Sequence, residues 1–303
     1  MTAAVNRATR ICATLCVLIV ATITLAQDAD VPEPFTAGEF AIVQDAMGYD
    51  AGIPLDAAIV GQTEFDTQTR YKVVFRGSRD EMVPGYMSIP KQGARPFPCV
   101  LLLHGYGSRK ERWWEDTYSS TLLTERLIAL GYAIFALDAK YHGERTSLNN
   151  YEPPSRMFGR GWNARLRSLA VETTIDYRRG LDWLETREEI DTERVGAIGY
   201  SMGGMMVFYL AALDERVDVA VACVPPMVGS PLFAPIRVAS HTADTPFALL
   251  VGADDGWYDA ALAASILTRI PATEKTLKVY DSGHRLPAEY VDDAVEWVRM
   301  HLE

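Results

Sequence analysis

Short runs of continuous apolar residues recur along the chain and constrain its fold more than any other feature. Strands that are apolar on both faces belong to parallel sheets whose two sides are covered by helices. The runs occupy residues 99–103, 133–137, 195–198, 219–222 and 247–251. They therefore predict the central strands of a buried sheet.

The segments between these runs carry helical spacing, as at Leu123, Leu127 and Leu130, which fall at i, i+4 and i+7. Less apolar strand candidates occupy residues 71–75, 85–89 and 277–280, and the first two predict an antiparallel hairpin. Strands that alternate with helices predict right-handed βαβ units. We therefore expect an α/β fold with a mostly parallel, eight-stranded sheet and helices on both faces.

The segment Gly199-Tyr200-Ser201-Met202-Gly203 directly follows one buried strand and precedes an apolar helix. It has the G-x-S-x-G pattern of a nucleophile elbow, in the strand-turn-helix context that the pattern requires. Glycines two residues before and after the serine remove side chains that would collide across the tight turn. The following helix directs its unpaired N–H groups towards the place where negative charge develops. The pattern predicts Ser201 as a nucleophile.

Three further loop motifs accompany the elbow: His104-Gly105-Tyr106-Gly107, Gly252-Ala253-Asp254-Asp255 and Ser282-Gly283-His284. Together the motifs resemble the α/β-hydrolase superfamily, over roughly residues 70–302. The hairpin and the strand that leads into His104 resemble its dienelactone hydrolase, acetyl esterase and prolyl-oligopeptidase catalytic-domain branch. Ser201 stands where dienelactone hydrolases have cysteine, and no β-propeller precedes the domain, so neither lactone specificity nor oligopeptidase gating is implied.

The resemblance implies a role for particular residues. The backbone N–H groups of Tyr106 and Met202 would form the oxyanion hole, and His104 would hold the loop by hydrogen bonding. The chain order of the superfamily is serine, acid, histidine, which implies His284 as the base. The Gly-x-x-Asp spacing implies Asp255 as the acid, with Asp254 as the alternative.

The other histidines after Ser201 are weaker candidates for the base. His241 precedes any well-placed acid, and His301 is expected in solvent on the last helix. Candidate walls of the substrate pocket are Tyr200, Trp257 and His142, although the motif around His142 also fits a structural role. The irregular segment 140–167 is expected at the carboxyl edge of the sheet, where ligands bind in such folds.

Composition excludes several function classes. The net charge of −11 disfavours binding to nucleic-acid phosphates. The sequence has neither a Cys/His zinc pattern nor a G-x-G-x-x-G after a strand, so neither a metal nor a cofactor is expected. Two of the four cysteines, Cys99 and Cys223, lie in strand-like runs and are expected as separate buried thiols.

The N-terminal residues have the pattern of a secretory signal peptide. Arg7 and Arg10 precede an uncharged run that ends in small residues at Ala26. We expect residues 1–26 to be a signal peptide, 27–69 an extended N-terminal arm and 70–303 the catalytic domain, and a retained membrane anchor is the alternative to cleavage after Ala26. The expected location is therefore periplasmic or extracellular, with no membrane span after cleavage.

The predicted function is hydrolysis of carboxylic esters, with short acyl groups favoured, on a small-molecule or polysaccharide-linked substrate. A peptidase or amidase on the same fold is an alternative, but no paired-glutamate motif for a substrate amine is present. A non-catalytic interaction protein is a second alternative, although such proteins usually lose a triad residue. The short segment between Cys223 and Phe247 leaves little room for a lipase lid.

Overall fold

The computed structural model describes residues 32–115, 118–226, 234–257 and 259–303. The predicted signal peptide, residues 1–26, lies outside the described residues. Contacts divide the chain into a unit that ends at Glu33 and a unit from Pro34 to Glu303. The second unit contains every element described below.

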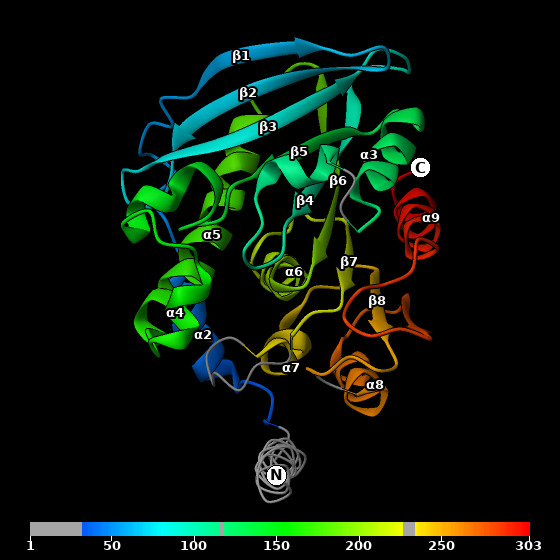
Figure 1. Ribbon diagram of the computed structural model, residues 1–303. Helices are drawn as coiled ribbons and strands as arrows, with labels where there is room; N and C mark the ends of the chain where they lie inside the picture. The colour runs from blue at the N-terminus through cyan, green and yellow to red at the C-terminus, as the bar shows by residue number, and fades with distance from the viewer. Residues whose placement is uncertain (1–31, 116–117, 227–233, 258) are drawn as a thin grey trace, which may run out of the picture. The chain divides into compact units, whose positions relative to one another are not determined.

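A single mixed sheet forms the centre of this unit (Figure 1), in the order β1-β2-β3-β5-β4-β6-β7-β8-β9. The first three strands pair antiparallel, as do β3 and β5, while the pairs from β5 through β4 to β9 are parallel. The strands are β1 (Ala58–Glu64), β2 (Gln68–Arg76), β3 (Met82–Pro90), β4 (Phe97–Leu103), β5 (Ala133–Leu137), β6 (Ile190–Tyr200), β7 (Val219–Cys223), β8 (Phe247–Gly252) and β9 (Lys275–Tyr280). The predicted α/β fold with a mostly parallel sheet is confirmed.

The predicted number of eight strands is wrong, because the sheet formed by the described residues has nine. The additional strand is β1, at the edge, in the segment that was expected to be an extended arm. Almost all of its residues are exposed, so it carries no alternating apolar pattern. Backbone pairing with β2 holds it in place, and such pairing leaves no signature in side-chain hydrophobicity.

Helices cover both faces of the sheet. They are α2 (Ala37–Ala46), α3 (Ser120–Ala129), α4 (Ser155–Gly159), α5 (Asn163–Leu184), α6 (Met202–Leu213), α7 (Pro235–Val238), α8 (Ala260–Arg269) and α9 (Tyr290–Leu302), with the short 3₁₀ helices η2 (Lys110–Trp114), η3 (Gly143–Asn149) and η4 (Ala239–His241). Helices α5 and α6 lie on one side of the sheet, and α3 and α9 lie on the other (Figure 1).

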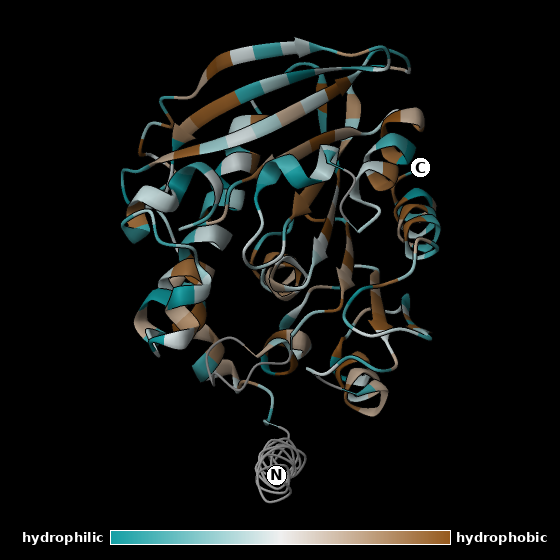
Figure 2. Ribbon diagram, in the orientation of Figure 1, coloured by the Kyte–Doolittle hydropathy of each residue, from teal (hydrophilic) through white to brown (hydrophobic). Residues whose placement is uncertain are grey.

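Alternate residues of the central strands supply the two cores. On β4, Leu101 and Leu103 join the core beneath α5 and α6, while Val100 and Leu102 join the core beneath α3 and α9. The hydrophobic colour runs along β5 and β8 (Figure 2), whose residues are all buried. This is why the central strands are continuous apolar runs in the sequence.

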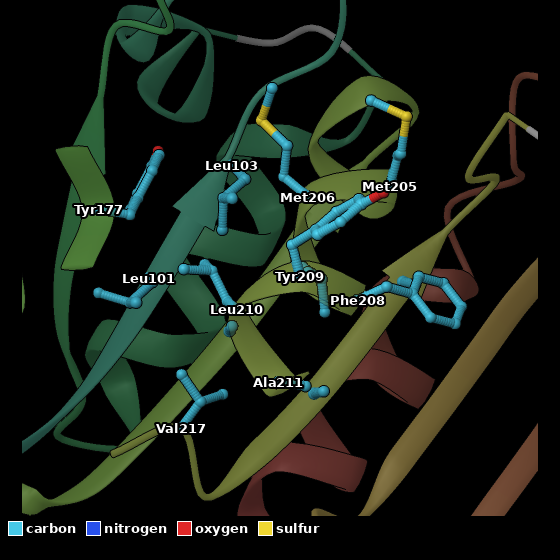
Figure 3. Close-up of a cluster of buried hydrophobic side chains, with 14 of the residues drawn as sticks. Leu101, Leu103, Tyr177, Met205, Met206, Phe208, Tyr209, Leu210, Ala211 and Val217 are labelled. Carbon is cyan, nitrogen blue, oxygen red and sulfur yellow. The ribbon is translucent and has the colours of Figure 1, made fainter. Parts of the chain in front are cut away.

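Helix α6 is buried along nearly its whole length, and its packing fixes the turn that precedes it. Its side chains Met206 and Tyr209 lie in the same cluster as Leu101 and Leu103 of β4 (Figure 3). Tyr177 of α5 links this helical layer to β4, because its hydroxyl donates a hydrogen bond to the Leu102 carbonyl at 2.8 Å. The first turn of α6 is therefore held rigidly against the end of β4.

The segment before β2 is more ordered than its sequence suggests. A capping box between Thr36 and Glu39 starts α2, which buries Phe40 and Val43.

The prediction of two separate thiols is confirmed, since Cys99 and Cys223 are free and buried. Among the described residues, no helix is both long enough and apolar enough to cross a membrane.

Candidate active site

Ser201 occupies the sharp turn between β6 and α6. Its backbone adopts φ 55° and ψ −118°, a conformation that costs energy for any residue with a side chain. A Cβ atom at Gly199 would overlap the Gly203 carbonyl, and a Cβ atom at Gly203 would overlap the Leu103 carbonyl. The two glycines therefore allow the turn to form, as the elbow pattern predicts.

His284 lies between Ser201 and Asp255. Its Nε2 atom is 2.9 Å from the Ser201 Oγ, and its Nδ1 atom is 2.8 Å from the Asp255 Oδ2. A carboxylate can only accept, so Nδ1 carries the proton and Nε2 is left to accept from the serine hydroxyl. The three residues form a continuous chain of hydrogen bonds.

The structure distinguishes the two candidate acids. Asp255 is buried and its Oδ1 accepts from the Trp257 N–H at 3.0 Å, which leaves Oδ2 directed at His284. Asp254 is exposed. A Cβ atom at Gly252 would overlap the Gly283 carbonyl, so the loop of the acid and the loop of the histidine are in direct contact. The hydrogen bond to His284 thus belongs to Asp255.

The loop after β4 lies against the serine. A Cβ atom at Gly105 would be 3.3 Å from the Cβ atom of Ser201. The next residue is Tyr106, whose backbone N–H has no hydrogen-bond partner among the described residues. Met202 is the first residue of α6, and the first N–H groups of a helix have no partner within it. Two backbone donors therefore flank the serine.

His104 holds this loop from below, as expected. Its Nε2 accepts from the Ala139 N–H at 3.0 Å and its Nδ1 donates to the Gly105 carbonyl at 2.9 Å. Burial lowers the pKa of His104 to about 4, so the ring is neutral at pH 7. A neutral ring can make both bonds, whereas a protonated one could not accept from Ala139.

Two of the three predicted pocket residues are buried. Tyr200 is 3% exposed, and its hydroxyl donates to the His284 carbonyl at 3.0 Å and accepts from the Leu286 N–H at 2.9 Å. His142 is fully buried against the rings of His104 and Tyr106. Only Trp257 is exposed. Aromatic residues near a predicted nucleophile pack as readily as they bind, and the sequence alone does not separate the two.

The other histidines lie elsewhere. His241 stacks on Phe40 with ring centroids 4.1 Å apart, and its Nε2 lies 2.7 Å from the Phe35 carbonyl oxygen. The expectation that His301 is in solvent is wrong, because only 9% of its side chain is exposed. It packs against Trp297, one turn earlier on α9. Neither histidine contacts Ser201 in the structure.

The segment 140–167, predicted as irregular, contains η3, α4 and the start of α5. It packs on the loop after β4, because the Tyr106 hydroxyl donates to the Pro154 carbonyl and the Tyr106 ring contacts Phe158. Buried ion pairs anchor the segment, among them Arg145 with Asp176 at 2.7 Å. These pairs join residues far apart in the sequence, so no local pattern indicates them.

A cavity of about 540 Å³ lies between this segment and the loop after β4. It is lined by Gly107, Ser108, Arg109, Glu111, Gly143, Glu144, Thr146, Pro153 and Pro154. Ser201, Asp255 and His284 do not line it. In the loop after β4, the first residue that lines the cavity is Gly107, directly after Tyr106. Arg109, Glu111, Glu144 and Thr146 contribute polar groups to its lining.

Comparison with known proteins identifies the family. The sequence profile of acetyl xylan esterases (AXE1) matches residues 43–234, which is more than half of the chain. The chain belongs to the acetyl xylan esterase family. The matched region contains Ser201 and the loop after β4, while Asp255 and His284 follow it.

Individual relatives are more distant. Over 150 residues the chain is 30% identical to YtaP of Bacillus subtilis (strain 168), covering 46% of this chain and 48% of that protein. It is 31% identical over 159 residues to esterase FrsA of Enterobacter sp. (strain 638), covering 52% of this chain and 32% of FrsA. The chain thus spans less than half the length of these relatives.

Solved structures support the fold. An acetyl xylan esterase from Paenibacillus sp. R4 superposes with a TM-score of 0.71 at 18% identity, covering 89% of this chain and 97% of the other. Acetyl xylan esterase 1 from Thermoanaerobacterium sp. JW/SL YS485 gives a TM-score of 0.67 at 17% identity, covering 90% and 96%. The α/β-hydrolase architecture of this chain is therefore shared with known esterases.

Proposed function

We propose that the protein hydrolyses carboxylic esters through an acyl-enzyme on Ser201, with His284 as general base and Asp255 as the residue that orients it. The observation that carries the proposal is the hydrogen-bonded chain from Asp255 through His284 to a serine with positive φ at a helix N-terminus. Membership of the acetyl xylan esterase family supports the same reaction.

The geometry supports the following sequence of steps. His284 Nε2 takes the proton of Ser201 as the serine oxygen attacks the ester carbonyl. The N–H groups of Tyr106 and Met202 stabilise the oxyanion, and one such donor typically contributes a factor of about 10²–10³ to kcat. His284 then protonates the leaving alcohol, and a water molecule activated by the same histidine releases the acid.

For the substrate, we propose a short acyl ester of a polyhydroxylated alcohol, such as an acetylated polysaccharide. The family name and the two similar acetyl xylan esterase structures support this class. The cavity beside the loop after β4 adds support, since Arg109, Glu111 and Thr146 offer donors and acceptors for sugar hydroxyls.

The first experiment compares hydrolysis of p-nitrophenyl esters from acetate to laurate by the wild type and by Ser201→Ala. We expect a Ser201-dependent rate that is highest for acetate, and release of acetate from acetylated xylan by the same enzyme. A maximum at laurate would instead indicate a lipase. Cleavage of aminoacyl p-nitroanilides with no ester hydrolysis would instead support an amidase.

We also propose that the protein is exported. The support is the pattern in residues 1–26, where Arg7 and Arg10 precede an uncharged run that ends at Ala26. Expression in a bacterial host followed by fractionation and N-terminal sequencing tests this. We expect a mature chain that begins at Gln27 outside the cytoplasm, and an uncleaved chain in the cytoplasm would contradict export.

A further inference from the structure

Arg112 lies in η2 and is the most unusual charged group near the site. It is 5% exposed, and its Nη2 atom has no hydrogen-bond partner. In the described part of the chain, no aspartate or glutamate forms an ion pair with it, and burial lowers the pKa of its guanidinium. Buried charges are normally paired, and a guanidinium stays protonated even when buried. The positive charge of Arg112 is therefore uncompensated by any described carboxylate.

Aromatic rings surround this guanidinium. Its Cζ atom lies 5.1 Å from the ring centroid of Tyr118, 5.3 Å from that of Tyr200 and 5.4 Å from that of Trp113. Its Nε donates to the Ser120 hydroxyl at 3.2 Å. Ring faces stabilise a cation without neutralising it. The field of Arg112 thus remains available to neighbouring groups.

The neighbours of Arg112 are parts of the active site. A Cβ atom at Gly105 would be 3.9 Å from the Arg112 Nη1 and 3.3 Å from the Cβ atom of Ser201, so the loop after β4 lies between the cation and the nucleophile. On its other side, Arg112 contacts Tyr200, whose hydroxyl binds the backbone of His284. One side chain therefore contacts both the oxyanion loop and the residue that holds the histidine loop.

We propose that Arg112 is a positioning residue of this site, which holds the oxyanion loop and Tyr200 in place and directs its positive charge, paired with no described carboxylate, towards the oxyanion. The inference rests on the proposed function, because it assumes an anionic transition state at Ser201. Arg112 acts through Gly105 and Tyr200 and does not itself contact the reacting atoms.

The test compares Arg112→Met and Arg112→Lys with a matched control, Arg179→Met. Arg179 is also buried, at 2% exposed, but it donates to backbone carbonyls such as that of Arg76, at 2.8 Å. Each enzyme is titrated with a fluorophosphonate to count active sites, and then kcat and KM are measured with p-nitrophenyl acetate. Urea unfolding is measured in parallel.

We expect Arg112→Met to lower kcat per titrated site about tenfold, which corresponds to ~1.4 kcal/mol, and to leave KM within about twofold. Its unfolding midpoint should fall less than that of Arg179→Met, because removal of a desolvated charge offsets the loss of the ring contacts and of the Ser120 hydrogen bond. Arg112→Lys keeps a cation, and its kcat should exceed that of Arg112→Met at least about threefold. Arg179→Met should unfold more easily and keep its kcat per site.

A wild-type kcat per site in Arg112→Met would overturn the inference while leaving the esterase itself intact. Equal loss of kcat in the Met and Lys variants would also overturn it, because the charge would then have no role. If the wild type shows no hydrolysis that depends on Ser201, the proposed function fails, and the inference about Arg112 fails with it.

Discussion

Gly203 tests whether the elbow is held by close backbone packing. A Cβ atom at this position would overlap the carbonyl group of Leu103, at the buried end of β4. Backbone in a central strand cannot move aside as a side chain could, so Gly203→Ala must displace the first turn of α6. Overpacking of this kind costs about 1–3 kcal/mol and sometimes more, and a rigid partner places the cost near ~3 kcal/mol.

The displacement also moves Ser201, two residues before Gly203. A shift of about 1 Å in a reacting group costs roughly 10²-fold in rate. We therefore expect Gly203→Ala to lose about 100-fold in kcat and to melt about 6 °C lower, since ~1 kcal/mol shifts Tm by about 2 °C in a chain of this size. Circular dichroism melting and p-nitrophenyl acetate kinetics measure both effects.

Gly159→Ala is the matched control. Gly159 lies in α4, and a Cβ atom there would meet nothing within 4 Å. Its stability should stay the same or rise by about 0.5–1 kcal/mol, because alanine is the better helix residue. Wild-type activity and Tm in Gly203→Ala would refute the steric account of the elbow.

Three further predictions concern charges. Asp255→Asn should lower kcat about 10³–10⁴-fold, because the amide no longer fixes the His284 tautomer, while the exposed Asp254→Asn should stay within about threefold in the same ester assay. Asp138→Ala removes a fully buried acceptor of the Lys110 ammonium and of the Lys110 and Glu144 backbone N–H groups, and it should lower the free energy of unfolding by about 3–5 kcal/mol in urea titrations, whereas a change below ~1 kcal/mol would contradict the account. His104 has a pKa of about 4 in the folded state against an ordinary value of 6.5. Between pH 4 and pH 6.5 the unfolded chain therefore binds a proton at this residue that the folded chain does not bind. Its contribution to the free energy of unfolding is therefore full above pH 6.5 and falls by about 3 kcal/mol as the pH drops to 4. His104→Gln should flatten this pH dependence by about one proton, and an unchanged slope would rule out His104 as its source.

The sequence predicts the parts of this protein that depend on local pattern. Buried parallel strands need apolar residues on both faces, so the central strands can be recognised in the sequence as continuous apolar runs. The elbow around Ser201 needs small residues at fixed offsets, and the structure shows a backbone clash at both Gly199 and Gly203. The choice of Asp255 came from a family spacing, and the hydrogen bond to His284 agrees with it.

Features that depend on long-range contact were not predictable in the same way. Strand β1 has mostly exposed side chains and pairs with β2 through its backbone. Tyr200 and His142 have the residue types of pocket walls, and only the packing around them shows that they are buried. Arg112 has the sequence context of an exposed charge, in a run of charged residues, and nothing local indicates its aromatic surroundings.

Covalent labelling of Ser201 tests the central claim most directly. A fluorophosphonate reacts with an activated serine, forming an oxygen–phosphorus bond and releasing fluoride. Peptide mass spectrometry of the labelled protein should find one adduct, on Ser201, and His284→Ala should abolish it. A label on a different residue, or undiminished labelling in His284→Ala, would contradict the assignment of Ser201 and His284 as nucleophile and base.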